Sequence, residues 1–243
     1  MASTSTTFDT DCVLMLHCNG ADGSTTFTDS SFQNTKTVTA NGDAQIDTAI
    51  SKFGGASGLY DQTGDYLSIP DSTDWDFGTG NFTIDFWVNF AQVVNSHGMM
   101  GQKVDASNLI RIGWDNATSF EFIVAGSGIS INVTKSWVPL ITVWYHVAII
   151  RGWGGNANDF AVTIDGTQIG TTVTDTDSMP DLAASWMIGT NNHNSDWNGS
   201  IDEIRIVKGT AVWTANFTAP SAEYNQAAAT TAKINKLMLM GIG

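Results

Sequence analysis

Near the end of the chain runs Gly199-Ser200-Ile201-Asp202-Glu203-Ile204-Arg205-Ile206-Val207, a typical β-strand sequence with a carboxylate among apolar residues. Side chains of a strand alternate between its two faces, so strict alternation places Asp202 with Ile204 and Ile206. Glu203 and Arg205 would then point the other way. An unpaired buried carboxylate costs several kcal/mol, so Asp202 must accept hydrogen bonds, pair with a cation or bind a metal ion.

Strand-like segments recur along the rest of the chain. The clearest is 81–90, where apolar side chains alternate with more polar ones; the apolar set is Phe82, Ile84, Phe86, Val88 and Phe90. Asp165-Gly166, between two short strand patterns, predicts a tight hairpin. Helical periodicity is hard to find before the last twenty residues. We therefore predict an all-β fold, a sandwich of two antiparallel sheets.

The composition excludes several classes of partner. The 243 residues carry a net charge of −14, which argues against binding to nucleic acid or to an anionic membrane. Most of the acidic residues are aspartates, which are typical of turns and of sites for hard cations. No secretory signal or membrane span is visible, which predicts a soluble protein made in a cytoplasm. Cys12 and Cys18 are too far apart on one strand to bridge each other, and we expect both in the core.

Several segments in their order along the chain resemble the concanavalin A-like lectin/glucanase superfamily, in its laminin-G-like jelly-roll branch. The resemblance extends over roughly residues 10–220 and includes the strand that contains Asp202. The other matching segments are Val13–His17, Asp22-Gly23, Asp29–Ser31, Lys52–Gly58, Gly64–Pro70, Asn81–Val88, Trp144–Ala148 with Arg151, and Ile164–Gly166. The Ser-, Thr- and Gly-rich composition also resembles bacteriophage surface proteins.

The resemblance implies a jelly roll with ligands on its concave face or on rim loops. It also implies a structural calcium ion near the first turn and the last strand, held by Asp22 or Asp29, by carbonyls around 54–58 and by Asp202. An alternative is that Asp202 accepts hydrogen bonds from loop N–H groups with no metal.

Glucanase chemistry is not expected. Glucanases of this fold use two glutamates on one strand to act on the sugar together. This chain has only Glu121, Glu203 and Glu223, none of them close to another in sequence. Alternation would also put Asp202 and Glu203 on opposite faces. His17 and His146 lie in strand patterns and are expected to be structural. We predict a non-enzymatic protein.

The loop 191–198 is the strongest candidate for ligand binding. Sugar recognition uses amides and carboxylates for hydroxyl groups and an aromatic face for the ring. The loop offers these groups in one place: Asn191, Asn192, His193, Asn194, Asp196 and Trp197. Trp114-Asp115-Asn116, and Trp153 with Asn156 and Asn158, offer similar chemistry on other loops. The alternative is that these are ordinary turn residues beside tryptophans that cap a sheet edge.

Three parts of the chain are expected: an N-terminal arm (1–10), a jelly-roll domain (11–224) and a C-terminal tail (225–243). The apolar end of the tail is expected to be buried, either on this domain or in a neighbouring subunit, where it would form the contact of a homo-oligomer. The alternative is a frayed terminus. The first functional hypothesis is a lectin-like module on a bacteriophage virion surface, for capsid decoration or as part of a tail or fibre. Its partners would be glycans and other virion proteins. The alternatives are a secreted bacterial carbohydrate-binding protein or an accessory domain of a polysaccharide-active enzyme.

Overall fold

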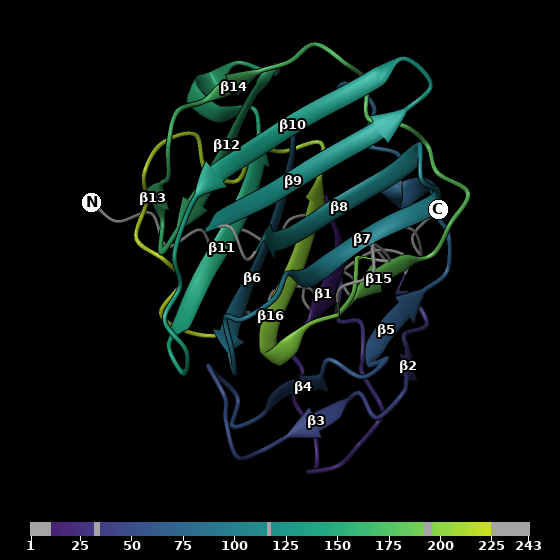
Figure 1. Cartoon of the computed structure of the whole chain (residues 1–243), viewed down its shortest axis with the longest axis vertical. Helices are drawn as coiled ribbons and strands as arrows, with labels where there is room; N and C mark the ends of the chain where they lie inside the picture. The colour runs from purple at the N-terminus through teal and green to yellow at the C-terminus, as the bar shows by residue number, and fades with distance from the viewer. Residues whose placement is uncertain (1–10, 32–34, 116–117, 192–195, 225–243) are drawn as a thin grey trace, which may run out of the picture.

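The computed structural model describes residues 11–31, 35–115, 118–191 and 196–224, and within them the fold is a sandwich of two antiparallel sheets, as predicted. Figure 1 shows the two sheets stacked, with β7 and β8 of one crossing over β6 and β16 of the other. The N-terminal arm and the C-terminal tail lie outside the described residues. No helix of the described part is long and apolar enough to cross a membrane.

Sheet A has nine strands and sheet B has seven. The spatial order in sheet A is β13 (Thr167–Gln168), β12 (Asp159–Ile164), β11 (Trp144–Arg151), β6 (Phe82–Phe90), β16 (Asn198–Lys208), β4 (Ser57–Asp61) and β3 (Gln45–Asp47), with β1 (Cys12–Leu16) also on β16 and β14 (Val173–Thr174) on β12. The order in sheet B is β10 (Ile129–Ser136), β9 (Ser119–Gly126), β8 (Asn108–Asp115), β7 (His97–Asp105), β15 (Trp186–Ile188), β5 (Tyr66–Ile69) and β2 (Thr39–Asn41). The helical parts are the 3-10 turns η1 (Thr73–Trp75) and η2 (Trp153–Gly155).

The core lies between the sheets, and β6 supplies one of its largest contributions. The predicted alternation of this strand is confirmed, because all five apolar residues from Phe82 to Phe90 belong to the core cluster. Thr83, Asp85 and Trp87 point to the outer face of sheet A instead, where Asp85 and Trp87 pair with residues of β16. The predicted hairpin at Asp165-Gly166 is also confirmed, since it joins β12 to β13. Both cysteines are buried and free, as expected.

A β-bulge in β16 overturns the predicted placement of Asp202. The register with β6 shifts between Asp202 and Arg205, and Glu203 has a positive φ of 49°. The extra residue reverses the alternation, as bulges do. Ile201, Ile204 and Ile206 therefore all face the core, whereas Asp202 pairs with Trp87 and Arg205 with Asp85 on the outer face. Asp202 does not share the face of the two isoleucines.

The segment 209–224, which we call the strap, crosses the outer face of sheet A. The Val212 N–H donates to Thr83 Oγ1 at 2.9 Å, and the stacked rings of Trp213 and Phe217 both pack against His146. Because the strap covers it, this face is buried although it carries several charged side chains. On the outer face of sheet B, by contrast, side chains such as Asn132 and Thr134 are exposed with respect to the described residues.

Candidate ligand-binding site at the loop end of the sandwich

Five connections lie together at one end of the sandwich, which we call the loop end. The strand register brings them there: Asn89 pairs with Trp144, Phe90 with Gly199, and Asp61 with Asn198. The connections are 62–65 (β4–β5), 91–96 (β6–β7), 116–118 (β8–β9), 137–143 (β10–β11) and 189–197 (β15–β16). The predicted ligand loop is therefore one of several loops at this end, and side chains from distant parts of the sequence meet there.

Three amide side chains from separate parts of the chain lie near one another at the loop end: Gln62 and Gln92 in two connections, and Asn198 at the start of β16. We call them the amide cluster. Gln92 Nε2 donates to Gln62 Oε1 at 2.5 Å. Asn198 Nδ2 lies 3.5 Å from the Asp61 carbonyl oxygen, beside Gln62, and the Ala91 N–H donates to the Asn198 carbonyl at 3.1 Å. All three amides are partly exposed. Each amide offers both a donor and an acceptor, the combination that pairs of sugar hydroxyls require.

The backbone around the amide cluster is tightly constrained. Gln62 has a φ of 72°, a left-handed conformation that is uncommon for a residue with a side chain. The turn is held by the Thr63 N–H, which donates to Asp61 Oδ1 at 2.8 Å. At Gly199, a Cβ atom would lie 2.1 Å from the Asn89 carbonyl oxygen, so only glycine allows β16 to start this close to β6. These restraints fix the backbone that carries Gln62 and Asn198 before any ligand arrives.

The predicted ligand loop is placed only in part. Asn191 is buried and Asp196 is half-buried. The backbones of Thr190 and Asp196 form an isolated antiparallel β-bridge. Asn192, His193 and Asn194 lie outside the described residues. Trp197 is fully buried in the core, with its ring 4.6 Å from that of Phe90. It therefore offers no face for a sugar to stack on, and the interpretation of Trp197 as a stacking platform does not fit the structure.

The other tryptophans proposed as stacking faces are also buried. Trp114 donates its Nε1–H to the Trp137 carbonyl at 2.9 Å, and Trp153 packs in a small cluster with Ala148 and Ile150. Asn156 is exposed beside Trp153, and Asn116 lies outside the described residues. Sequence reasoning missed Gln62 and Gln92, which are single glutamines in turns and carry no motif. Only the strand register brings them together with Asn198.

Asp202 holds a loop against β16. Its Oδ2 accepts hydrogen bonds from the Lys52 and Phe53 N–H groups at 2.9 and 3.1 Å, and its Oδ1 accepts one from the Glu203 N–H at 2.8 Å. Burial of the carboxyl raises its pKa to about 7, although the loop N–H groups act in the opposite direction. This is the metal-free arrangement considered as the alternative, in which loop N–H groups satisfy the carboxylate.

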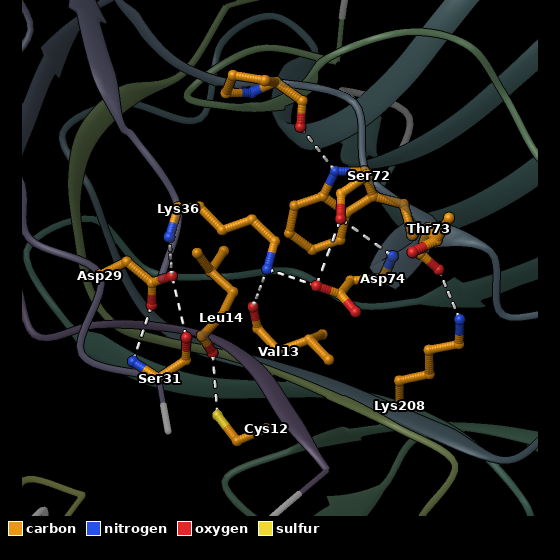
Figure 2. Close-up of polar contacts among 12 residues, drawn as sticks. Cys12, Val13, Leu14, Asp29, Ser31, Lys36, Ser72, Thr73, Asp74 and Lys208 are labelled. Atoms are coloured by element: carbon orange, nitrogen blue, oxygen red, sulfur yellow. Dashed lines mark hydrogen bonds and ion pairs between the residues drawn. The ribbon is translucent and has the colours of Figure 1, made fainter. Parts of the chain in front are cut away.

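Asp29 and Asp22 make separate contacts of their own. Asp29 is buried and accepts from the Met15, Ser31 and Lys36 N–H groups at 3.1, 2.9 and 2.7 Å. Figure 2 shows Asp29 between Ser31 and Lys36, with the Lys36 ammonium turned toward Asp74. Asp22 is exposed and accepts from the Thr48 N–H at 3.1 Å.

These contacts bear on the expected metal site. The four hydrogen bonds that Asp29 accepts use all the lone-pair sites of its carboxylate, and the three that Asp202 accepts leave one site open. Among the described residues, no group of three or more histidine, cysteine, aspartate or glutamate side chains is arranged to hold a metal ion. The three aspartates therefore do not converge on one shared site. Calcium binding by the protein stays a prediction.

The three glutamates are held in different ways. Glu121, on β9 of sheet B, pairs with Arg111 at 2.7 Å. Glu203 is buried in sheet A, where it contacts His17 Nδ1 at 2.7 Å and accepts from the Tyr224 N–H at 2.9 Å. Burial would lower the pKa of His17, but the hydrogen bond and charge of Glu203 raise it above its usual value. Glu223 accepts from Asn19 Nδ2 at 2.8 Å. The bulge places Glu203 on the same outer face as Asp202, contrary to the predicted alternation of side chains. Both carboxyl groups are buried there and form hydrogen bonds with other groups of the protein.

A comparison with known families is consistent with this geometry. Residues 61–214, which include β5 to β16 and all five connections of the loop end, match a laminin G family described as the concanavalin A-like lectin/glucanases superfamily. The chain belongs to this superfamily. The jelly-roll fold expected of a superfamily member is therefore shown by both sequence and structure. No curated protein matches the sequence.

Three solved structures have a similar fold at low sequence identity. Domain 4 of AbnA, a GH43 extracellular arabinanase from Geobacillus stearothermophilus, solved in complex with arabinotriose, has a TM-score of 0.63 at 19% identity, over 84% of this chain and 95% of that one. The binding domain of Paraclostridial Mosquitocidal Protein 1 also has a TM-score of 0.63, at 15% identity, over 91% of this chain and 51% of that one. The botulinum neurotoxin serotype G binding domain has a TM-score of 0.58 at 12% identity, over 93% and 51%. The chain thus spans about half the length of the toxin binding domains.

Proposed function

We propose that this protein is a non-enzymatic carbohydrate-binding module whose ligand contacts the amide cluster at the loop end. The observation that carries the proposal is that Gln62 and Gln92, from two connections, lie close to Asn198 at the start of β16, on a constrained backbone. Neutral amides suit a neutral glycan, because they bind hydroxyl groups without the cost of desolvating a charge. The similarity to a domain solved with arabinotriose supports a saccharide ligand. The three glutamates lie apart and each contacts a different side chain of the protein, which supports a binding role rather than hydrolysis.

The amide cluster gives a direct test of glycan binding. We expect a glycan array to identify a ligand for the wild-type protein, and replacement of both Gln62 and Gln92 by alanine to weaken that binding. A lost hydrogen bond costs about 1 kcal/mol, or roughly a factor of five in affinity, so the double variant should bind about 30-fold more weakly in calorimetry. Both glutamines are partly exposed in turns, and the change should leave the fold intact.

Asn108 provides a matched control for this test. It is a partly exposed amide at the far end of the sandwich, where Nδ2 donates to Asp105 at 3.0 Å. Asn108→Ala should bind the glycan as the wild type does. Equal weakening by both changes, or normal binding by the Gln62/Gln92 double variant, would show that the site lies elsewhere. Turnover of the bound glycan by the pure protein would contradict the non-enzymatic part of the proposal.

We propose further that the module acts on the surface of a bacteriophage particle, in capsid decoration or as part of a tail or fibre. The net charge of −14 and the composition rich in Gly, Ser, Thr and Asn support a surface-exposed β-module. Mass spectrometry of purified particles should then detect the protein in a fixed copy number per virion. Its recovery only from culture medium, free of particles, would instead support the secreted carbohydrate-binding alternative.

A further inference from the structure

Most of the exposed large apolar side chains in the described residues gather at the loop end. They lie in the connections 91–96 and 137–143 and are between 38% and 65% exposed; the five are Val94, Val138, Leu140, Ile141 and Val143. We call this group the apolar patch. No charged residue occurs in 91–96 or in 136–144, although the protein carries a net charge of −14. Exposed apolar groups collected in one place indicate an interaction surface.

The backbone under the apolar patch is ordered by hydrogen bonds. The Thr142 N–H donates to the Phe90 carbonyl at 2.9 Å, and the Leu140 N–H donates to Tyr145 Oη at 3.1 Å. Trp137, at the start of the same connection, packs on Phe90 and Tyr145. The patch is therefore presented on a fixed support, and a partner would not have to order the loop as it binds.

The same chain contains an uncharged apolar segment that could cover the patch: Leu237-Met238-Leu239-Met240-Gly241-Ile242-Gly243. The described chain ends at Tyr224, whose Oη lies 3.3 Å from His146 Nε2. His146 is two residues from Trp144, the first residue of β11 after the 137–143 connection. The intervening residues 225–236 can extend over about 40 Å at roughly 3.3 Å per residue, far more than the roughly 10 Å of strand between His146, which Tyr224 contacts, and Val143 of the patch.

We propose that the segment 237–243 packs on the apolar patch of its own molecule. Neither surface carries a charged side chain, so their contact removes apolar area from water without desolvating one. A tether of this length gives an effective concentration in the millimolar range, about a thousandfold above a micromolar protein solution, and this favours the chain's own segment over that of a second copy. The contact does not depend on the proposed glycan binding, because it uses none of the amide cluster.

Disulfide trapping tests this contact in the full-length chain. The two native cysteines are buried, so a Leu140→Cys/Met240→Cys variant would carry the accessible thiols. Leu140 is 65% exposed, and its replacement should not disturb the core. The matched control is Val104→Cys/Met240→Cys, since Val104 is an exposed apolar residue on β7 at the opposite end of the sandwich. Under mild oxidation we expect an intramolecular bond in the first variant, formed about tenfold faster than in the control because the docked thiols have a higher effective concentration.

The rate should not change with protein concentration, and the product should have the mass of one chain. Adding Leu237→Asp and Leu239→Asp to the first variant should reduce its rate to that of the control, because charged side chains would not enter an apolar contact. Equal rates at residues 140 and 104 would overturn the proposal. So would a rate that the two aspartates leave unchanged, or a product found only as a crosslinked dimer, which would assign the patch to a second copy.

Discussion

Replacement of Arg205 by methionine is expected to lower the free energy of unfolding by about 3–5 kcal/mol, because it leaves a buried carboxylate without its cation. Asp85 is fully buried under the strap, with Oδ1 2.9 Å from Arg205 Nε and Oδ2 3.3 Å from an Arg205 terminal nitrogen. Burial alone would raise the pKa of the Asp85 carboxyl, but the charge of Arg205 and the hydrogen bond with His146 lower it. Urea unfolding at pH 7, followed by tryptophan fluorescence, measures the loss.

Two controls separate this effect from the loss of a long side chain. The Arg111–Glu121 pair is at a similar distance, 2.7 Å, but its side chains are 22% and 21% exposed. Arg111→Met should therefore cost only about 0–1 kcal/mol. Adding Asp85→Asn to Arg205→Met should recover part of the stability, since the double variant no longer has a buried carboxylate without its cation at this position. Equal losses from the two arginine changes would show that the buried pair is not a main source of stability.

The strap depends on this pair as well. Tyr224 donates a short hydrogen bond to Asp85 and stacks its ring over the Arg205 guanidinium at 4.0 Å. Its N–H also donates to Glu203. Loss of Arg205 should therefore loosen the strap before the sheets separate. Hydrogen exchange should show this as faster exchange at Val212 and Tyr224 than in the strands of sheet B.

The second large effect concerns Asp202 and pH. Because burial raises the pKa of Asp202 to about 7, the folded protein holds a proton there that the unfolded chain has released. The contribution of this group to the free energy of unfolding should therefore fall as pH rises from about 4 to 7, by up to about 4 kcal/mol, at about 1.4 kcal/mol per pKa unit. His17 acts in the same direction, because its raised pKa gives a contribution that is complete below pH 6.5 and is lost at higher pH.

Asp202→Asn should remove most of this pH dependence. The asparagine oxygen can still accept from the Lys52 and Phe53 N–H groups, while its amide nitrogen would face the Glu203 N–H at a cost of about 1 kcal/mol. The melting temperature measured from pH 4 to 8 should thus lose the fall with rising pH that Asp202 causes. The contribution of His17 would remain, and so would the opposite one of His97, because burial lowers the pKa of His97 to about 4 and its stabilising effect is lost as pH falls. Asp22→Asn, an exposed carboxylate, is the control and should retain the wild-type slope.

Calcium would reverse the sign of this dependence. A bound cation favours the charged carboxylate, so a calcium-loaded protein should gain stability as pH rises, and a chelator should lower its melting temperature. Asp202→Asn would then abolish the response to the chelator. No response of the wild type to calcium or chelator would contradict the calcium prediction and leave the hydrogen-bonded aspartate as the full account.

The sequence predicted the elements whose signal is local. The alternation of apolar and more polar side chains from Phe82 to Phe90 arises because one face of this strand packs on the core and the other lies on the outer face of sheet A. Asp165 and Gly166 adopt the positive φ angles that a tight turn requires. The bulge at Glu203 could not be predicted, because one inserted residue leaves no mark in the pattern except a reversed alternation. Asp85 was placed correctly on the face opposite the core, but its burial depends on a strap more than a hundred residues later.

The candidate site shows the same division. Amide-rich turns were visible in the sequence, but whether a tryptophan beside a turn faces solvent or the core is decided by packing. Trp197, Trp114 and Trp153 all proved to be buried. Gln62 and Gln92 lie in connections and Asn198 begins β16, so the three come together only when β4, β6 and β16 are in register. Pairing between such distant strands cannot be predicted from any one segment of the sequence.

The position of β16 has a consequence for how the chain folds. This strand, among the last to be synthesised, lies between β6 on one side and β4 and β1 on the other. Until it arrives, all three earlier strands have an unpaired edge, and such edges promote aggregation. Topologies dominated by distant pairings also fold slowly. A nascent chain that stalls before residue 198 would therefore be open to misassociation, and its folding in the cell would have to wait for nearly the whole domain to leave the ribosome.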